Sequence, residues 1–177
     1  MRTFMLLASA VLASVLTGCS LDKDFTFSIE KDFVVNNYSS TTYSRSDTVD
    51  ASKSSSDYSK YKSDLKSLDI QSASYTITYF SGSAAQKIVT GTLNVGSLGS
   101  VPSKILATVS DVILSSVASI TQPLTLTDDG KQYFKDQLMG STSSAIINLS
   151  LTTNQAPISF TVRIHFDIKA TYSKSIL

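Results

Sequence analysis

The stretch ISFTVRIHFDIKATY, residues 158–172, alternates between apolar and polar side chains from end to end. Successive side chains of a β-strand point to opposite faces, so this pattern predicts one long strand with a buried face and a solvated face. The residues expected on the buried face are Ile158, Phe160, Val162, Ile164, Phe166, Ile168, Ala170 and Tyr172. This stretch therefore indicates a domain built on a β-sheet.

Four shorter segments have the same alternating character and are separated by turn-forming sequences. They are residues 25–30, 73–80, 87–95 and 144–151. Together with the long strand they indicate about seven strands, a number typical of two packed antiparallel sheets. The expected fold class is mainly β: an antiparallel β-sandwich with roughly two or three short helices, formed by residues 25–177 as one domain.

Two segments predict helices. Apolar residues recur at helical spacing in residues 56–68, behind a serine and an aspartate that can cap the first turn. Residues 126–140 contain Thr127, which can cap a helix, and end at Gly140, a natural stop. Residues 104–120 stay open, because their apolar residues fit a helical stripe while their β-branched content favours a strand; we lean towards a helix.

Residues 36–56, NNYSSTTYSRSDTVDASKSSS, differ from the rest of the chain. They are rich in serine and threonine and poor in apolar residues, so we expect an exposed, mobile loop between the first strand and the first helix. Thr48 lies in the triplet Asp47–Val49, which resembles a short O-glycosylation site of some Gram-negative bacteria. About one such match is expected by chance, and the plain loop is the favoured interpretation.

The only cysteine of the chain, Cys19, follows a positive start and an apolar run that is too short to span a bilayer as a helix. With the residues before it, Cys19 makes the sequence LTGC, which closely resembles the lipobox of bacterial lipoproteins. The resemblance implies that residues 1–18 are a signal peptide and that Cys19 is acylated and becomes the first residue of the mature protein. Residues 19–24 would then be the acylated cysteine and a tether.

The general pattern resembles the small β-sandwich lipoproteins of Gram-negative cell envelopes. That resemblance implies a lipid-anchored protein of the outer membrane. A non-acidic residue, Ser20, follows the cysteine and is compatible with export to this membrane. Residues 22–24, DKD, resemble a surface-export tract only loosely, so the periplasmic and the outer face both stay open.

Charge restricts the partners. Arg2 is the only charged residue of residues 1–18, and without it the basic and acidic residues balance. A neutral chain lacks the basic surface that a nucleic acid requires, so no nucleic-acid partner is expected. The expected partners are the lipid bilayer, through acylated Cys19, and an envelope protein or polymer that the sequence does not identify.

Chemistry-bearing motifs are scarce, and we expect no catalytic residues, no metal and no cofactor. Once Cys19 is acylated no thiol remains, and the chain has no phosphate-binding glycine loop, nucleophile elbow or cluster of metal ligands. The single histidine, His165, lies on the polar face of the long strand beside Arg163 and Asp167. It could act as a general base oriented by Asp167, but a solvated strand face with cross-strand charge pairs is the favoured interpretation.

Tyrosine is frequent, and three tyrosines at strand spacing, Tyr75, Tyr79 and Tyr172, form a candidate ligand groove. The alternative is that they form the rim of the sandwich core. The expected function is a non-catalytic binding or scaffolding module at the outer membrane. The alternatives are a purely structural envelope component and, less favoured, a hydrolase that uses His165.

Overall fold

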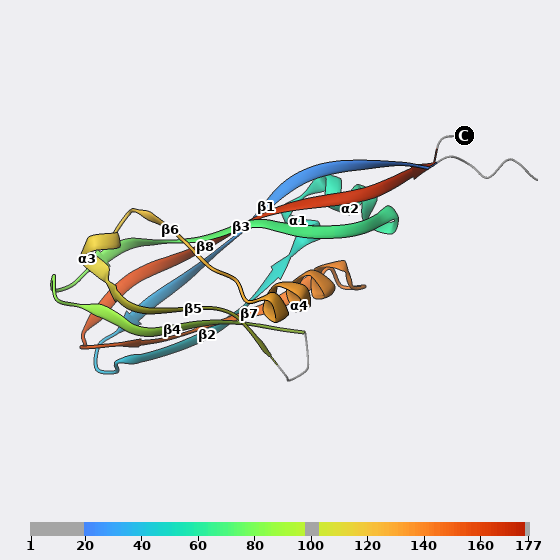
Figure 1. The fold of residues 1–177 in the computed structure, drawn as a ribbon. Coiled ribbons are helices and arrows are strands. Elements are labelled where there is room, and N and C mark those ends of the chain that lie inside the picture. The colour runs from blue at the N-terminus through green and yellow to red at the C-terminus, as the bar shows by residue number, and fades with distance from the viewer. Residues whose placement is uncertain (1–19, 98–102, 176–177) are drawn as a thin grey trace, which may run out of the picture.

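The computed structural model describes residues 20–97 and 103–175 as two four-stranded sheets packed face to face (Figure 1). All strand pairs are antiparallel, in the orders β1-β8-β3-β6 and β2-β7-β4-β5. The predicted mainly β, antiparallel sandwich is therefore confirmed. The strands are β1 (Ser20–Asn37), β2 (Thr42–Asp50), β3 (Leu65–Ser81), β4 (Lys87–Gly96), β5 (Lys104–Ile113), β6 (Thr121–Pro123), β7 (Ser144–Thr153) and β8 (Ile158–Ser175). The helices are α1 (Ala51–Ser54), α2 (Ser56–Tyr61), η1 (Lys62–Asp64, a 3-10 turn), α3 (Leu114–Val117) and α4 (Asp128–Met139).

Strand β8 lies at the centre of its sheet, between β1 and β3. All residues predicted on its inner face are buried, and those from Ile158 to Ala170 form one apolar core with buried residues of β4, β5 and β7. The alternation of residues 158–172 thus reports a real difference between a dry face and a wet face.

Helix α4 lies between the two sheets where they diverge (Figure 1). Phe134 and Leu138 are fully buried, and the ring of Phe134 lies 5.0 Å from that of Phe166 on β8. The Thr127 hydroxyl accepts a hydrogen bond from the amide of Gly130 at 3.1 Å, and the helix ends at Gly140. The helix predicted over residues 126–140 is confirmed.

The mobile loop predicted for residues 36–56 is wrong. Nine of its residues form β2, which pairs with β7 in continuous register from Thr42 to Asp50, and α1 follows at once. Val49 is buried and Tyr43 partly buried, while the residues between them are mostly exposed. A strand forms here with only two inward-facing side chains, because β7 satisfies its backbone hydrogen bonds. Composition alone does not show that such a partner strand exists.

Two helix predictions need correction. The helix expected over residues 56–68 ends at Tyr61, and β3 begins at Leu65 after the 3-10 turn. The inclination towards a helix for residues 104–120 is wrong for β5, since only the short α3 is helical in that segment. β5 pairs with β4, which satisfies its backbone and suits its β-branched side chains.

The tether predicted over residues 19–24 is also corrected, since β1 begins at Ser20. The acidic side chains of this segment lie on a strand and form ion pairs: Asp22 with Lys66 at 2.6 Å, and Asp24 with Lys169 at 2.7 Å. Cys19 and the predicted signal peptide lie outside the described residues.

Candidate functional site

Three chain reversals meet at one end of the sandwich and form a cleft of about 470 Å³, which we call the end cleft. Because the sheets are antiparallel, β1, β3 and β7 all end there. The cleft is lined by residues 36–38, by residues between 81 and 86, and by residues 155–159. Its volume lies in the range of about 300–1,000 Å³ that is typical of small-molecule sites.

The floor of the end cleft is held by a buried side chain, Gln86, which is only 4% exposed. Its Nε2 donates to the carbonyl of Pro157 at 2.6 Å, and its Oε1 accepts from the amide of Ser83 at 3.0 Å. A Cβ on Gly82 would lie 1.7 Å from that Oε1, so any side chain there would displace Gln86. The hydrogen bond to Pro157 therefore connects the reversal between β3 and β4 with the reversal between β7 and β8.

Two asparagines complete this framework. Asn154 accepts from the amide of Lys87 at 2.8 Å and donates to the carbonyl of Ala85 at 3.0 Å. Asn37 donates to the carbonyl of Thr42 at 2.8 Å, which closes the reversal between β1 and β2. A side-chain amide thus stabilises each reversal around the cleft, so the shape of the cleft is fixed by the protein's own hydrogen bonds.

Other polar groups of the lining are free. Within the described residues, the side chains of Asn36, Gln155 and Ser159 form no hydrogen bond. Tyr38, also in the lining, is 80% exposed. An amide offers donors and acceptors together, and a tyrosine offers an apolar ring with a polar tip. The cleft can therefore bind polar groups of either hydrogen-bonding sense without using charge.

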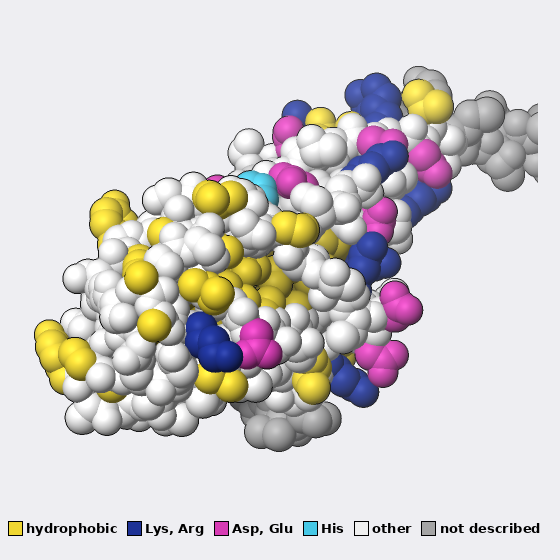
Figure 2. Space-filling view, turned by 60° about the vertical axis from the view of Figure 1, so that its left-hand side comes forward, with side chains coloured by type: hydrophobic (Ala, Val, Ile, Leu, Met, Phe, Trp, Pro, Cys, Tyr) yellow, Lys and Arg dark blue, Asp and Glu magenta, His cyan; other side chains and the backbone are white. Residues whose placement is uncertain are grey.

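Charge is distributed unevenly along the sandwich. On the face shown in Figure 2, acidic and basic side chains gather towards the end where β1 begins. The segments that build the other end contain no Asp, Glu, Lys or Arg: 33–44, 70–86, 112–127 and 144–162. Lys87 and Asp111 lie at that end, and they pair with each other at 2.7 Å. The end cleft consequently opens on a largely uncharged surface.

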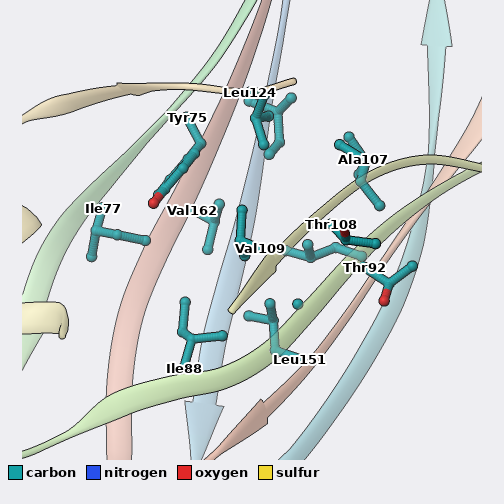
Figure 3. A pocket seen from close by; sticks show the side chains of 14 residues that line it. Tyr75, Ile77, Ile88, Thr92, Ala107, Thr108, Val109, Leu124, Leu151 and Val162 are labelled. Carbon is teal, nitrogen blue, oxygen red and sulfur yellow. The ribbon is translucent and has the colours of Figure 1, made fainter. Parts of the chain in front are cut away.

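A second, apolar crevice lies between the sheets (Figure 3). Tyr75, Ile77 and Val162 line it from one sheet, and Ile88 and Leu151 from the other. It offers about 30 Å³, which is roughly the space of one water molecule. The crevice is therefore a gap in the core packing and too small for an organic ligand.

The predicted tyrosine groove is wrong, because the structure does not bring its three residues together. Tyr75 is buried opposite Ile164, whereas Tyr172 lies eight residues further along β8, roughly 26 Å away at about 3.3 Å per residue. Tyr172 stacks on Tyr61 with ring centroids 4.0 Å apart. Tyr79 is 86% exposed, at a backbone φ of 54°. Two of the tyrosines thus belong to the core and its rim, and the third stands apart.

His165 lies on the outer face of β8, with carboxylates at both ring nitrogens. Nε2 is 2.9 Å from Asp167 and Nδ1 is 3.0 Å from Glu30. The hydrogen bond to Asp167 raises the pKa of His165 above its usual value, assisted by Glu30 and opposed by desolvation. An imidazole whose two nitrogens both contact carboxylates has neither nitrogen free to take a proton from a substrate, so it is poorly placed to act as a general base. The geometry matches the cross-strand charge pairs favoured from the sequence.

Within the described ranges, no group of three or more His, Cys, Asp or Glu side chains is arranged to hold a metal ion. In the same part of the chain, no helix has the length and apolar character needed to cross a membrane.

The residues of the end cleft were missed in the sequence. They lie in the turn sequences NNYSS, SGSAAQ and TTNQAP, which are far apart along the chain and simply mark the ends of strands. The available signal was the concentration of asparagine, glutamine and serine in three uncharged turns that a sandwich topology can bring to one end.

Comparison with known proteins adds little. No protein-family model matches the chain, and no curated protein matches its sequence. Among solved structures, the chain is similar to one described as Desmodium yellow mottle tymovirus, with 13% sequence identity and a TM-score of 0.39, over 97% of this chain and 98% of that one. A TM-score this low supports no conclusion about a shared fold or function.

Proposed function

We propose that this protein is a bacterial envelope lipoprotein, anchored in the outer membrane by acylated Cys19, and that its folded domain is a non-catalytic binding module. The observation that carries the proposal is the course of β1. This strand begins at Ser20, the residue after Cys19 in the sequence, and ends at Asn37 in the end cleft. An anchor at Cys19 would therefore lie at the opposite end of the sandwich from the cleft.

The length of β1 sets the distance involved. Its 18 residues span roughly 60 Å at about 3.3 Å per residue. A binding site at this distance from the lipid surface is free to meet a partner in the space beyond. The charged end would face the headgroups, where hydrated side chains are readily accommodated, and the uncharged cleft would face away from them.

The anchor is tested by metabolic labelling with a palmitate analogue, followed by membrane fractionation. We expect label in the wild type and in the control variant Ser20→Ala. In Cys19→Ser, label and cleavage before residue 19 should both be lost. An unlabelled wild type, or a Cys19→Ser protein that is still processed and membrane-bound, would refute the lipoprotein assignment.

The orientation has a test of its own, because acylation of Cys19 leaves the chain without a free thiol. Cysteines introduced as Leu21→Cys and Tyr38→Cys replace side chains that are 50% and 80% exposed, at opposite ends of the sandwich. After labelling with a fluorophore in vesicles, a nitroxide-bearing lipid should quench the probe at residue 21 strongly and the probe at residue 38 weakly. Equal quenching would refute the proposed orientation.

A further inference from the structure

We infer that the end cleft binds an uncharged, hydroxyl-rich polymer, that is, a neutral glycan chain. The inference rests on the proposed function, since it names the class of ligand that the binding module would take. It is carried by three observations on the described residues: the absence of charge in the lining, the free amides in it, and a second hydroxyl-lined groove that adjoins it.

A charged ligand does not fit the cleft. None of the residues that line it is Asp, Glu, Lys, Arg or His. The charges of Lys87 and Asp111, which lie at the same end of the sandwich, already neutralise each other at 2.7 Å. A carboxylate, phosphate or ammonium group that entered the cleft would lose hydration without gaining a counter-charge.

A purely apolar ligand would leave polar groups of the lining unsatisfied. The side-chain amides of Asn36 and Gln155 have no hydrogen-bond partner among the described residues, so an apolar group placed over them would cut these amides off from water. A sugar hydroxyl both donates and accepts, as do the two groups of an amide, and can satisfy them directly. The exposed ring of Tyr38 provides a flat apolar surface for the face of a sugar ring.

The adjoining groove indicates a chain rather than a single sugar. It has a volume of about 410 Å³ and lies across β2, β7 and β4. Thr42, Ser44 and Thr152, which carry hydroxyl groups, are among its lining residues, and none of the lining residues is charged. One hydrogen bond links the two linings: Asn37, from the end cleft, donates to the carbonyl of Thr42, from the groove, at 2.8 Å. A polymer can therefore extend from one site towards the other over residues that carry no charge.

The experiment is affinity electrophoresis of the full, detergent-extracted protein through gels that contain dextran, mannan or the anionic dextran sulfate. We expect retardation by dextran or mannan that persists in about 0.5 M salt, where ionic attraction is screened. Tyr38→Ala should weaken this retention about tenfold, the loss typical of an aromatic anchor. Tyr79→Ala removes an equally exposed tyrosine that does not line the cleft, and it should leave retention unchanged.

Three outcomes overturn the inference: no retardation by either neutral polymer, retardation by dextran sulfate alone, or an equal loss in Tyr79→Ala and Tyr38→Ala. Its failure is distinguishable from failure of the anchor. Retention is measured in detergent, so it does not require the lipid anchor. If Cys19→Ser protein binds a neutral glycan as the wild type does, glycan binding by the cleft does not depend on acylation. Conversely, if the protein incorporates palmitate but no neutral glycan retards it, the proposed lipid anchor is supported and only the glycan inference is refuted.

Discussion

Arg163 on β8 donates two hydrogen bonds to Asp32 on β1, from Nε to Oδ1 at 2.8 Å and from a terminal nitrogen to Oδ2 at 2.9 Å. The two residues lie directly opposite each other in the antiparallel register. This two-pronged contact holds the pKa of Asp32 below its usual value. Two further pairs on the outer face of the sheet also join β8 to β1: His165 with Glu30, and Lys169 with Asp24.

The protonated His165 is expected to stabilise the fold most below neutral pH. Its folded-state pKa is raised, first by the hydrogen bond to Asp167, so its contribution is complete below the unfolded-state pKa of about 6.5. The contribution is lost as the pH rises through the higher, folded-state pKa. The free energy of unfolding, measured by urea titration over a series of pH values, should fall in the wild type as the pH increases. In His165→Gln this fall should be smaller. Since this is the only histidine, its titration can also be followed alone by NMR, and a pKa at or below 6.5 would contradict the prediction.

Replacing Gly130 in α4 by alanine should destabilise the protein, against helix propensity. Propensity alone favours alanine in a helix by about 1 kcal/mol. A Cβ on Gly130, however, would lie 2.3 Å from the carbonyl oxygen of Ile105 and 2.7 Å from Cα of Leu106, and neither backbone atom can move freely. We expect a net loss of about 1–3 kcal/mol in the free energy of unfolding, measured by urea titration. Gln132→Ala, at an exposed position of the same helix, is the control and should change stability by less than about 0.5 kcal/mol.

Tyr58→Phe should destabilise the junction between α2 and α4. Tyr58 is fully buried, and its hydroxyl donates to the carbonyl of Leu138 and lies 3.4 Å from the hydroxyl of Ser143. Removing the hydroxyl leaves a buried carbonyl without this partner, at a cost of about 1–3 kcal/mol. Tyr38→Phe removes the same atom at an exposed position and should leave the melting temperature unchanged. Equal melting temperatures for both variants would show that the buried hydrogen bond contributes nothing.

Adjacent substitutions test whether β2 is part of the core. Val49→Asp would place an unpaired charge where the side chain is 2% exposed, and we expect a loss of about 3 kcal/mol or more. Thr48→Asp puts the same group on the exposed side of the strand and should cost less than about 0.5 kcal/mol. Chemical denaturation of both proteins is the measurement. If residues 42–50 formed a mobile loop, both substitutions would be harmless.

The sequence by itself determined the class of fold and two of its elements. Side-chain alternation reports a strand directly, because one face is dry and the other wet, and every residue assigned to the dry face of residues 158–172 is buried. Thr127 and Gly140 bound α4 because capping is a local interaction between neighbours in the chain. The same alternation put His165 on the outer face, among charged partners.

Only the tertiary structure decided what depends on a distant partner. Residues 42–50 are a strand because β7 pairs with them, and residues 104–113 are a strand because β4 does, although neither composition nor periodicity required it. Tyr75 and Tyr172, proposed as parts of one groove, are separated by eight residues along β8, because Tyr75 on β3 pairs with Ile164. The sequence does not reveal which residues of two strands lie opposite each other. The end cleft unites three turns that are separated by more than forty residues along the chain. Turn sequences mark where strands end, while the pairing of strands and the packing of the two sheets determine which ends meet.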